Sequence, residues 1–325
     1  MSGEGFDRNI YPTDLRHLLK ICLEQTKEED ATGPSKYEEM SEERRKWLEE
    51  AMKAATEDPV VELKECIRIL IEKGDSEDEI EEKEEALEKL CFLCEDMDLS
   101  QDFHKIGGYA LLPHLLHNDS SDIRWRGAEL IANLCQNNPY CQRAALEANL
   151  LPLLIDTLEK DSVVLVKVKA LYAMSCFVRG FTDGETAFMK SNGLSVLMRA
   201  MQDGDDKLKV KATFLLKCLF SQNRLIKDTL CDMGMVEQLV GLLSEQHNNN
   251  HEHFMNALLS LATEHQRTIE ECQRPELHMK ELLKNRIEYL TGKEEFLEEK
   301  EYAEQLEKMC FGSQSKKTGE TPVNR

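Results

Sequence analysis

The chain has 325 residues, of which 41 are basic and 62 acidic, so its net charge is −21 and its sequence pI is about 4.9. Nucleic acids and anionic membranes repel so acidic a chain, and proteins are its expected partners. The charge is uneven, because residues 36–96 carry a net −12 and residues 121–231 a net +3. Exposed charges act over about 8–10 Å, so the central segment is expected to present a basic surface.

Eleven cysteines are present, most of them among apolar residues in helical patterns, which predicts buried free thiols. Cys91 and Cys94 have CxxC spacing, but they lie in one apolar helical run without a second pair, so core packing is favoured over metal or redox chemistry. Neither a signal-peptide pattern nor a run of 18 apolar residues occurs. We therefore expect a cytoplasmic protein that does not associate with membranes.

Residues 1–39 are predicted to be a flexible arm that contains one short amphipathic helix, which Asp14 can cap. The apolar stripe of this helix has helical spacing and consists of Leu15, Leu18, Leu19 and Leu23. A helix of about a dozen residues is only marginally stable alone. Residues 40–82 follow as a predicted N-terminal helical cap, with helices over residues 42–55 and 60–72 and an acidic connector over residues 74–82.

Residues 83–274 are predicted to be repeats, because two markers recur together about every 42 residues. Gly107, Asn149, Gly193 and Gly234 each open a leucine-rich stretch, and basic pairs open apolar helical runs. The long helices are expected at residues 84–96, 122–137, 163–179, 207–221 and 251–264. Helical repeats of about 40–47 residues are typical of armadillo and HEAT proteins. We predict an all-α, armadillo-like right-handed solenoid, closed by a C-terminal helical cap (275–311) and a disordered tail (312–325).

A solenoid aligns the same position of each repeat along one face, so the basic pairs should form a ladder. Helical projection places an aromatic residue beside the cation in two repeats, with Cys176 and Cys218 on the same outward strip. Leu171, Met174 and Leu216 should face inward. The candidate partner-binding residues are Arg124, Arg126, Lys167, Lys169, Tyr172, Lys209, Lys211 and Phe214. Two interpretations stay open: the strip binds a partner, or the aromatic side chains fill crevices between repeats while the lysines are solvated.

No constellation of residues indicates catalysis. The chain has no glycine-rich phosphate loop after a strand and no serine, cysteine or histidine arrangement in a catalytic motif, so no enzyme activity, cofactor or metal is expected. His251 and His253 are expected to be solvated. Two binding functions remain from the residues alone: a clamp for a folded acidic surface, or an adaptor for acidic extended peptides.

Several long stretches closely resemble the heat-shock-protein-70-binding protein family, in particular its cytosolic branch. They include MSEERRKWLEEAM at residues 40–52 and VKVKALYAMSC at residues 166–176, with further matches at residues 123–131, 193–201, 207–211 and 230–236. The resemblance covers about residues 40–311. It implies four armadillo-like repeats between helical caps and a monomer in the free state.

The resemblance also implies a function. Members of this family are nucleotide exchange factors: their curved surface holds one lobe of the nucleotide-binding domain of the 70-kDa heat-shock chaperone and promotes ADP release. The N-terminal arm, here Leu15, Leu18, Leu19 and Leu23, would imitate a chaperone client. Regulation of chaperone-linked ubiquitination is a further property that the resemblance implies.

Overall fold

The structure is a computed structural model, and it describes residues 42, 46–47, 58–74, 76–222 and 224–312. The chain divides into two compact units, residues 1–65 and residues 66–325. In the first unit the longest described segment is the beginning of α3 (Pro59–Glu72), where the Asp58 carboxylate accepts a hydrogen bond from the Val60 amide at 3.0 Å. The predicted arm with Leu15, Leu18, Leu19 and Leu23 lies outside the described residues, as does the predicted tail beyond Gly312.

The second unit is built from helices throughout its described residues. After α4 (Glu77–Leu93), the helices follow one another in sets of three. The first two sets are α5 (Met97–Lys105), η1 (Gly108–Leu111) with α6 (Leu112–Leu116), α7 (Ser121–Cys135), then α8 (Pro139–Glu147), α9 (Leu150–Lys160), α10 (Val164–Val178). The next two are α11 (Thr182–Lys190), α12 (Gly193–Ala200), α13 (Asp206–Gln222), then α14 (Arg224–Asp232), α15 (Met235–Ser244), α16 (His251–Ala262). The last set is α17 (Gln266–Cys272), η2 (Pro275–Leu277) with α18 (Met279–Leu290), η3 (Glu294–Phe296) with α19 (Leu297–Phe311).

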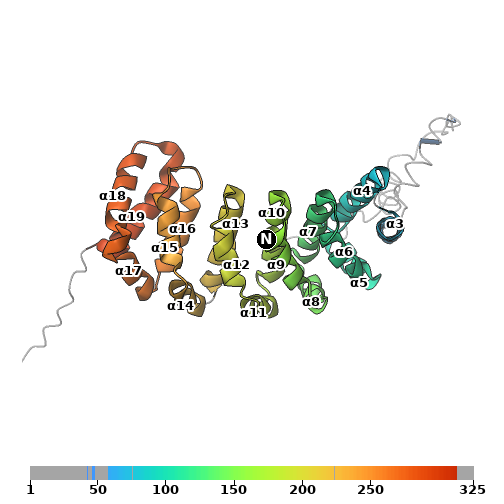
Figure 1. Cartoon of the computed structure of the whole chain (residues 1–325), viewed down its shortest axis with the longest axis horizontal. Helices are drawn as coiled ribbons and strands as arrows, with labels where there is room; N and C mark the ends of the chain where they lie inside the picture. Colours follow the sequence, from blue (N-terminus) through green and yellow to red (C-terminus); the bar gives the residue numbers. More distant parts are fainter. Residues whose placement is uncertain (1–41, 43–45, 48–57, 75, 223, 313–325) are drawn as a thin grey trace, which may run out of the picture. The chain divides into compact units, whose positions relative to one another are not determined.

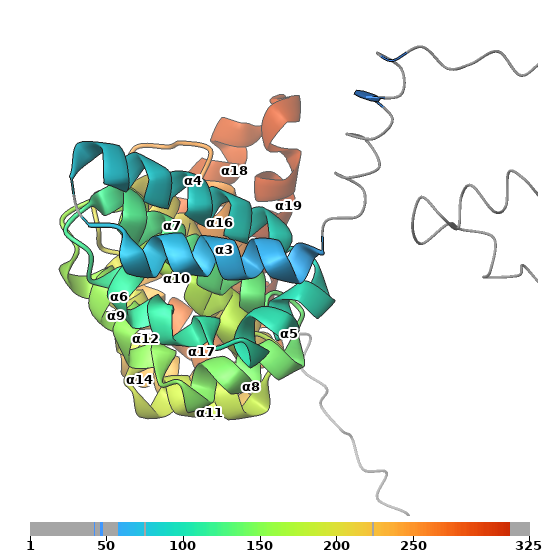
Figure 2. The same ribbon diagram turned by 90° about the vertical axis from the view of Figure 1, so that its right-hand side faces the viewer.

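The third helix of each set packs against the third helix of the next. This row runs α4, α7, α10, α13, α16 and α19, and each neighbouring pair is in contact (Figure 1). The end-on view shows α7, α10 and α16 behind one another, with α8, α11 and α14 along the opposite side (Figure 2). The prediction of an all-α repeat solenoid is confirmed.

The glycine and asparagine markers lie where the chain turns from the first to the second helix of a set. Gly107, Asn149 and Gly234 adopt positive φ, where glycine and asparagine are favoured. In the third set the left-handed residue is Asn192, and Gly193 begins α12, as expected of a residue that opens a leucine-rich stretch. Gly193 is required for space, since a Cβ atom there would lie 2.4 Å from the Phe188 ring.

The acidic segment before the repeats is helical, and the predicted connector over residues 74–82 is therefore wrong from Glu77 onward. Ser76 caps α4, and the carboxylate of Glu79 accepts hydrogen bonds from the Ser76 amide and hydroxyl. Acidic residues in a first helical turn are stabilised by the helix dipole. Here Glu77, Asp78 and Glu79 occupy that turn, which is why a strongly acidic run begins a helix.

The core follows the predicted helical projection, with one correction. Leu171, Met174 and Leu216 are completely buried, as expected. Cys176 is only 3% exposed, so it is not part of an exposed strip, although it lines the same hollow as Phe214; Cys218 is half-buried. The other eight described cysteines are buried, which agrees with the prediction of a thiol-rich core.

Candidate functional site

The first basic residue of each pair reaches forward to the next repeat. Arg124 on α7 makes a bidentate ion pair with Asp161: Nε lies 2.6 Å from Oδ2, and Nη2 lies 3.0 Å from Oδ1. Lys167 on α10 lies 3.0 Å from the Asp203 carboxylate. Lys209 on α13 lies 3.8 Å from Glu245 and, within its own helix, 3.8 Å from Asp206. Paired charges of this kind connect one repeat to the next.

The second basic residue of each pair reaches back to the preceding repeat. Arg126 approaches Glu88 of α4 at 3.8 Å, and Lys169 is paired with Glu129 of α7. On α13 the pattern changes, because the position that is glutamate on α4 and α7 is Tyr172 on α10. The Lys211 ammonium lies 5.1 Å from the Tyr172 ring centre and has no ion pair within the described part of the chain.

Three of the hollows in the described part of the chain lie along this row of helices. The first, of about 710 Å³, is lined from α4 to α10 and contains Glu88, Glu95 and Glu129 around the exposed Phe92 and Met97. Its wall is acidic, so it differs in charge from the hollows farther along the row. The surface along the ladder is therefore not basic throughout.

The second hollow, of about 480 Å³, lies between α10 and α13, and it combines lysines with apolar side chains. Val164 and Leu165 are 41% and 45% exposed there. Lys207 and Lys211 line the same hollow, together with Asp205 and with Lys169, which is paired with Glu129. An acidic partner that carries an apolar side chain would match this surface, because it offers charge and apolar contact together.

The third hollow, of about 590 Å³, lies at the opposite end of the same two helices. Phe214 is 50% exposed in it, and the Arg179 guanidinium lies 5.5 Å from the Phe214 ring centre. Half-exposed phenylalanine is costly in water and is enriched where proteins bind partners. The α10–α13 surface, defined here as the lining of the second and third hollows, is the candidate functional site.

The structure separates the eight predicted residues into two groups. Arg124, Lys167 and Lys209 lie in ion pairs between repeats, and Arg126 is mostly enclosed, packed 4.5 Å from the Trp125 ring centre. The members on the α10–α13 surface are Lys169, Tyr172, Lys211 and Phe214.

Sequence reasoning missed the acidic partners of the ladder, although a signal for them was present. Asp161, Asp203 and Glu245 recur every 42 residues, in step with the lysines that they bind. A matching acidic ladder predicts ion pairs between repeats. Val164 and Leu165 were also missed, because two apolar residues at a helix start look like core residues.

The histidine at the start of α16 is buried, so the expectation of a solvated His251 is wrong, whereas His253 is exposed. Ligand atoms of His247, His251 and Glu299 lie within 4.8 Å of one another, a spacing that could hold a metal ion. The Arg286 guanidinium donates to His251 Nδ1 at 2.6 Å and to Glu299 Oε1 at 2.9 Å. This arginine therefore already supplies the positive charge between the donors, and the cluster joins α16 to α18 and α19.

Comparison with known proteins gives the family. The model described as "SIL1/FES1/HPBP1 C-terminal domain" matches residues 99–238, and the model described as "Nucleotide exchange factor Fes1" matches residues 15–103. Hsp70-binding protein 1 of Rattus norvegicus is 42% identical over 93% of this chain and 87% of its own length. The chain belongs to the Hsp70-binding protein 1 family.

More distant comparisons agree with this family and with the fold. The Hsp70 nucleotide exchange factor FES1 of Saccharomyces cerevisiae is 25% identical over 60% of this chain and 68% of its own length. A designed armadillo repeat protein, YIII(Dq)4CqI, superimposes with a TM-score of 0.61 at 18% identity, covering 76% of this chain and 99% of that chain. The armadillo-like class is thereby shown. Within the described residues, no helix is long and apolar enough to cross a membrane.

Proposed function

We propose that this chain is a nucleotide exchange factor for the 70-kDa heat-shock chaperone, which it binds through the α10–α13 surface. The observation that carries the proposal is the relationship to Hsp70-binding protein 1 over 93% of the chain. The half-exposed Phe214 and the unneutralised Lys211 supply a contact surface of the expected kind. The alternative, an adaptor for acidic extended peptides, is not favoured by this relationship.

Exchange by such a protein requires no catalytic group. If the factor binds a form of the nucleotide-binding domain that holds ADP weakly, its binding energy lowers the affinity of the chaperone for ADP. By the same linkage, ADP lowers the affinity of the chaperone for the factor by an equal factor. The protein needs only a rigid surface that fits the weak-binding form, and the packed third helices with their ion pairs between repeats supply one.

The proposal places the protein in the cytosol, as a monomer without ATPase activity of its own. Residues 1–39 would act as the arm that competes with bound clients. These points follow from the family resemblance.

The test is stopped-flow release of a fluorescent ADP analogue from the isolated chaperone nucleotide-binding domain. Release should accelerate with increasing concentration of the factor and then saturate, while ATP hydrolysis by the factor alone stays at background. Release that remains at the uncatalysed rate with excess factor rejects the proposal.

A further inference from the structure

The acidic hollow between α4 and α10 contains apolar side chains that the repeats leave exposed. Phe92, in the last turn of α4, is 72% exposed, and Met97, the first residue of α5, is 51% exposed. Tyr172 of α10 lines the same hollow, whose volume of about 710 Å³ falls within the usual range of ligand pockets, ~300–1,000 Å³. Exposed apolar side chains gathered in one hollow are typical of a surface that binds a partner. Burial of Phe92 and Met97 by a partner would therefore be favourable.

The negative charge of this hollow is only partly neutralised by neighbouring repeats. Glu95 is exposed and has no ion pair within the described residues. Glu88 is also exposed, and its carboxylate approaches Arg126 only to 3.8 Å. Exposed ion pairs of this kind are weak. Glu129 differs, because it is closely paired with a lysine of α10. The carboxylates of Glu88 and Glu95 therefore remain available to a cation that a partner supplies.

The ends of two helices add to this negative potential. The helix α4 ends at Leu93 and α7 ends at Cys135, and residues that follow both ends line the hollow. The last carbonyl groups of a helix carry a partial negative charge, which attracts cations. At the end of α10 the cation is Arg179, whereas the corresponding positions after α4 and α7 are Glu95 and Gln136. The row of helix ends thus changes from basic at α10 to acidic at α4.

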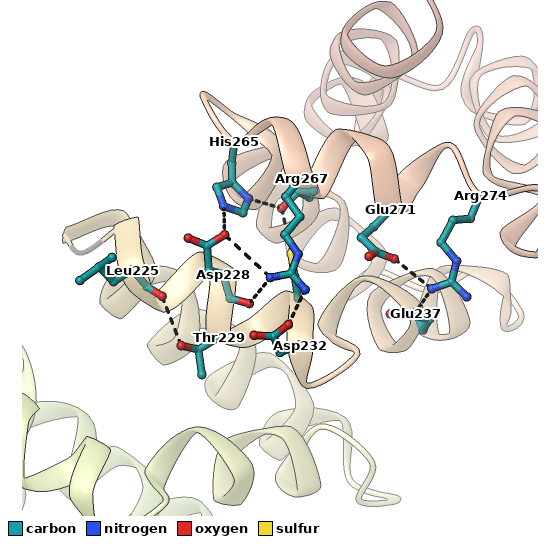
Figure 3. A network of polar contacts seen from close by, with 11 residues as sticks. Leu225, Asp228, Thr229, Asp232, Glu237, His265, Arg267, Glu271 and Arg274 are labelled. Atoms are coloured by element: carbon teal, nitrogen blue, oxygen red, sulfur yellow. Dashed lines mark hydrogen bonds and ion pairs between the residues drawn. The ribbon is translucent and has the colours of Figure 1, made fainter.

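Acidic residues at the other end of the repeats have a different environment. Asp232 of α14 is paired with Arg267 of α17, and Glu237 of α15 is paired with Arg274 just beyond α17 (Figure 3). Each of these carboxylates joins two successive sets of helices, and an arginine balances its charge. Within the described residues Glu95 has no such arginine, so this carboxylate does not join repeats.

Amide side chains complete the lining of the acidic hollow. Asn133, Gln136 and Asn137 contribute groups that both donate and accept hydrogen bonds, as a peptide backbone requires. The Asn133 side chain is oriented by a hydrogen bond that its Nδ2 donates to the Cys91 carbonyl at 2.9 Å. Apolar, acidic and amide groups are therefore present together, which suits a peptide better than a simple cation.

We propose that the acidic hollow binds a peptide segment of a partner in which lysine or arginine adjoins an aromatic or large aliphatic residue. The cation would pair with Glu88 and Glu95, and the apolar side chain would cover Phe92 and Met97. An exposed ion pair alone is weak, whereas the two contacts together select a segment that carries both kinds of residue. This occupant has the opposite charge to the one that matches the α10–α13 surface, so the acidic hollow is a second binding site with a specificity of its own.

The test measures the fluorescence anisotropy of a labelled synthetic peptide in which lysine and leucine alternate around a central phenylalanine. The full-length protein is titrated into this probe at low salt. Two matched probes carry serine in place of the apolar residues, or glutamate in place of the lysines. The first probe should bind at least about tenfold more tightly than either matched probe, and added salt should weaken its binding. No chaperone is present, so the outcome does not depend on the proposed function.

Variants at exposed positions locate the site. Phe92→Ser and Glu88→Gln/Glu95→Gln should each weaken binding of the first probe about fivefold or more, since each removes one of the two contacts. A chain of net charge −21 attracts any cationic peptide. The control is therefore Asp232→Asn/Glu237→Gln, which removes two negative charges from the ion pairs of Figure 3 and should bind the probe like the parent.

The proposal is overturned if the serine probe binds as tightly as the first probe, because the hollow would then attract any cation. Equal weakening by the control and by Glu88→Gln/Glu95→Gln would overturn it too, because binding would then follow net charge alone. Substitutions at exposed positions should leave the fold intact, and melting curves check this. If a variant nevertheless fails to fold, the comparison of the three probes on the parent protein decides.

Discussion

Single positions decide what the basic ladder does. The residue three positions after the second basic residue is Glu129 on α7, Tyr172 on α10 and Phe214 on α13. A carboxylate at this position neutralises the cation of the next repeat, as Glu129 does for Lys169. An aromatic ring leaves the charge in place, as Tyr172 does for Lys211. A change of one residue type thus replaces an ion pair that joins two repeats by a lysine that lies over an aromatic ring.

His251 should make the free energy of unfolding depend on pH. Burial and the adjacent Arg286 guanidinium lower the pKa of His251 to about 4, whereas an unfolded histidine has a pKa of about 6.5. Between these values the unfolded chain binds a proton that the folded chain does not, so stability falls as the pH falls through this window. At pH 5.5 the loss relative to pH 7.5 should be about 1 kcal/mol.

This expectation is measured by urea unfolding of the parent and of His251→Asn at both pH values. Carboxylates that titrate nearby affect both proteins equally, so the comparison isolates the histidine. If the variant loses as much stability as the parent on acidification, His251 is protonated in the folded state and the expectation is wrong.

Replacement of either of two glycines by alanine should change the stability of the protein, but in different directions. A Cβ atom at position 193 would lie 2.4 Å from the Phe188 ring, whereas nothing lies within 4 Å of one at position 241 in α15. Gly193→Ala should therefore destabilise the protein by about 1–3 kcal/mol through overpacking. Gly241→Ala should be neutral or stabilise it by up to about 1 kcal/mol, because alanine favours a helix. Denaturant midpoints check both, and a stable Gly193→Ala protein would contradict the close packing.

Between helices, the ion pairs of the ladder should contribute unequally to stability. Arg124 is mostly enclosed and also donates to the carbonyl oxygens of Asn118 and Asp119 at 3.0 and 2.9 Å. Arg124→Ala should thus cost about 1–3 kcal/mol, the usual effect of removing charged hydrogen bonds from a buried acid. The control is Arg143→Ala, because both side chains of the Arg143–Asp183 pair are more than half exposed, and it should cost less than about 1 kcal/mol. Equal unfolding midpoints for the two variants would refute this ranking.

Most helices and turns could be predicted from the sequence, because every repeat has the same pattern of apolar residues and the same turn between its first two helices. The 42-residue interval gave the long helices, and the left-handed turn residues fall at or beside the markers. The start of α4 could not be predicted from charge alone: its acidic run looked like a connector, yet the Ser76 cap and the helix dipole favour a helix.

The candidate site was predictable only in part. Helical projection placed Tyr172 and Phe214 correctly near the surface, but it gives no contact between repeats. Whether a lysine is free depends on which acid the neighbouring repeat presents, and this is set by the stacking of α10 on α7 and α13. Cys176 shows the same limit: the projection places it on the helix face of the half-buried Lys169, and only the packing of neighbouring helices leaves it 3% exposed.

At the scale of the whole molecule, the arm and the repeats should be separable in function. Removal of residues 1–35 should leave the acceleration of ADP release unchanged, because the α10–α13 surface lies entirely in the second unit. Release of a bound client peptide should slow, since the arm is expected to compete for the client site. A fluorescent client displacement assay measures this, with a scrambled sequence over residues 14–23 as the control for length. Loss of ADP exchange in the truncated protein, or normal client release, would reject the division.

Docking itself should depend on the few charges that the repeats leave unpaired. Lys207 is exposed, Lys211 lies over the Tyr172 ring without an ion pair in the described part of the chain, and both lie in the hollow that Val164 and Leu165 line. The variant Lys207→Glu/Lys211→Glu should therefore weaken chaperone binding about tenfold or more at low salt, or ~1.4 kcal/mol. Its melting temperature should stay near that of the parent, because a substitution at the exposed Lys207 changes stability by less than about 0.5 kcal/mol, and the half-buried Lys211 has no ion pair to lose within the described residues.

The matched control reverses the charge of Lys167, which already forms an ion pair with Asp203 of the next repeat. In Lys167→Glu a carboxylate would face Asp203, so its main effect should be lower stability. Titration of labelled nucleotide-binding domain at two salt concentrations separates the cases, since screening reduces the contribution of exposed charges. The Lys207→Glu/Lys211→Glu protein should bind more weakly than the parent at low salt, and the difference should shrink as salt rises. If it binds as tightly as the parent at low salt, the partner lies on another surface, and the acidic hollow between α4 and α10 becomes the next one to test.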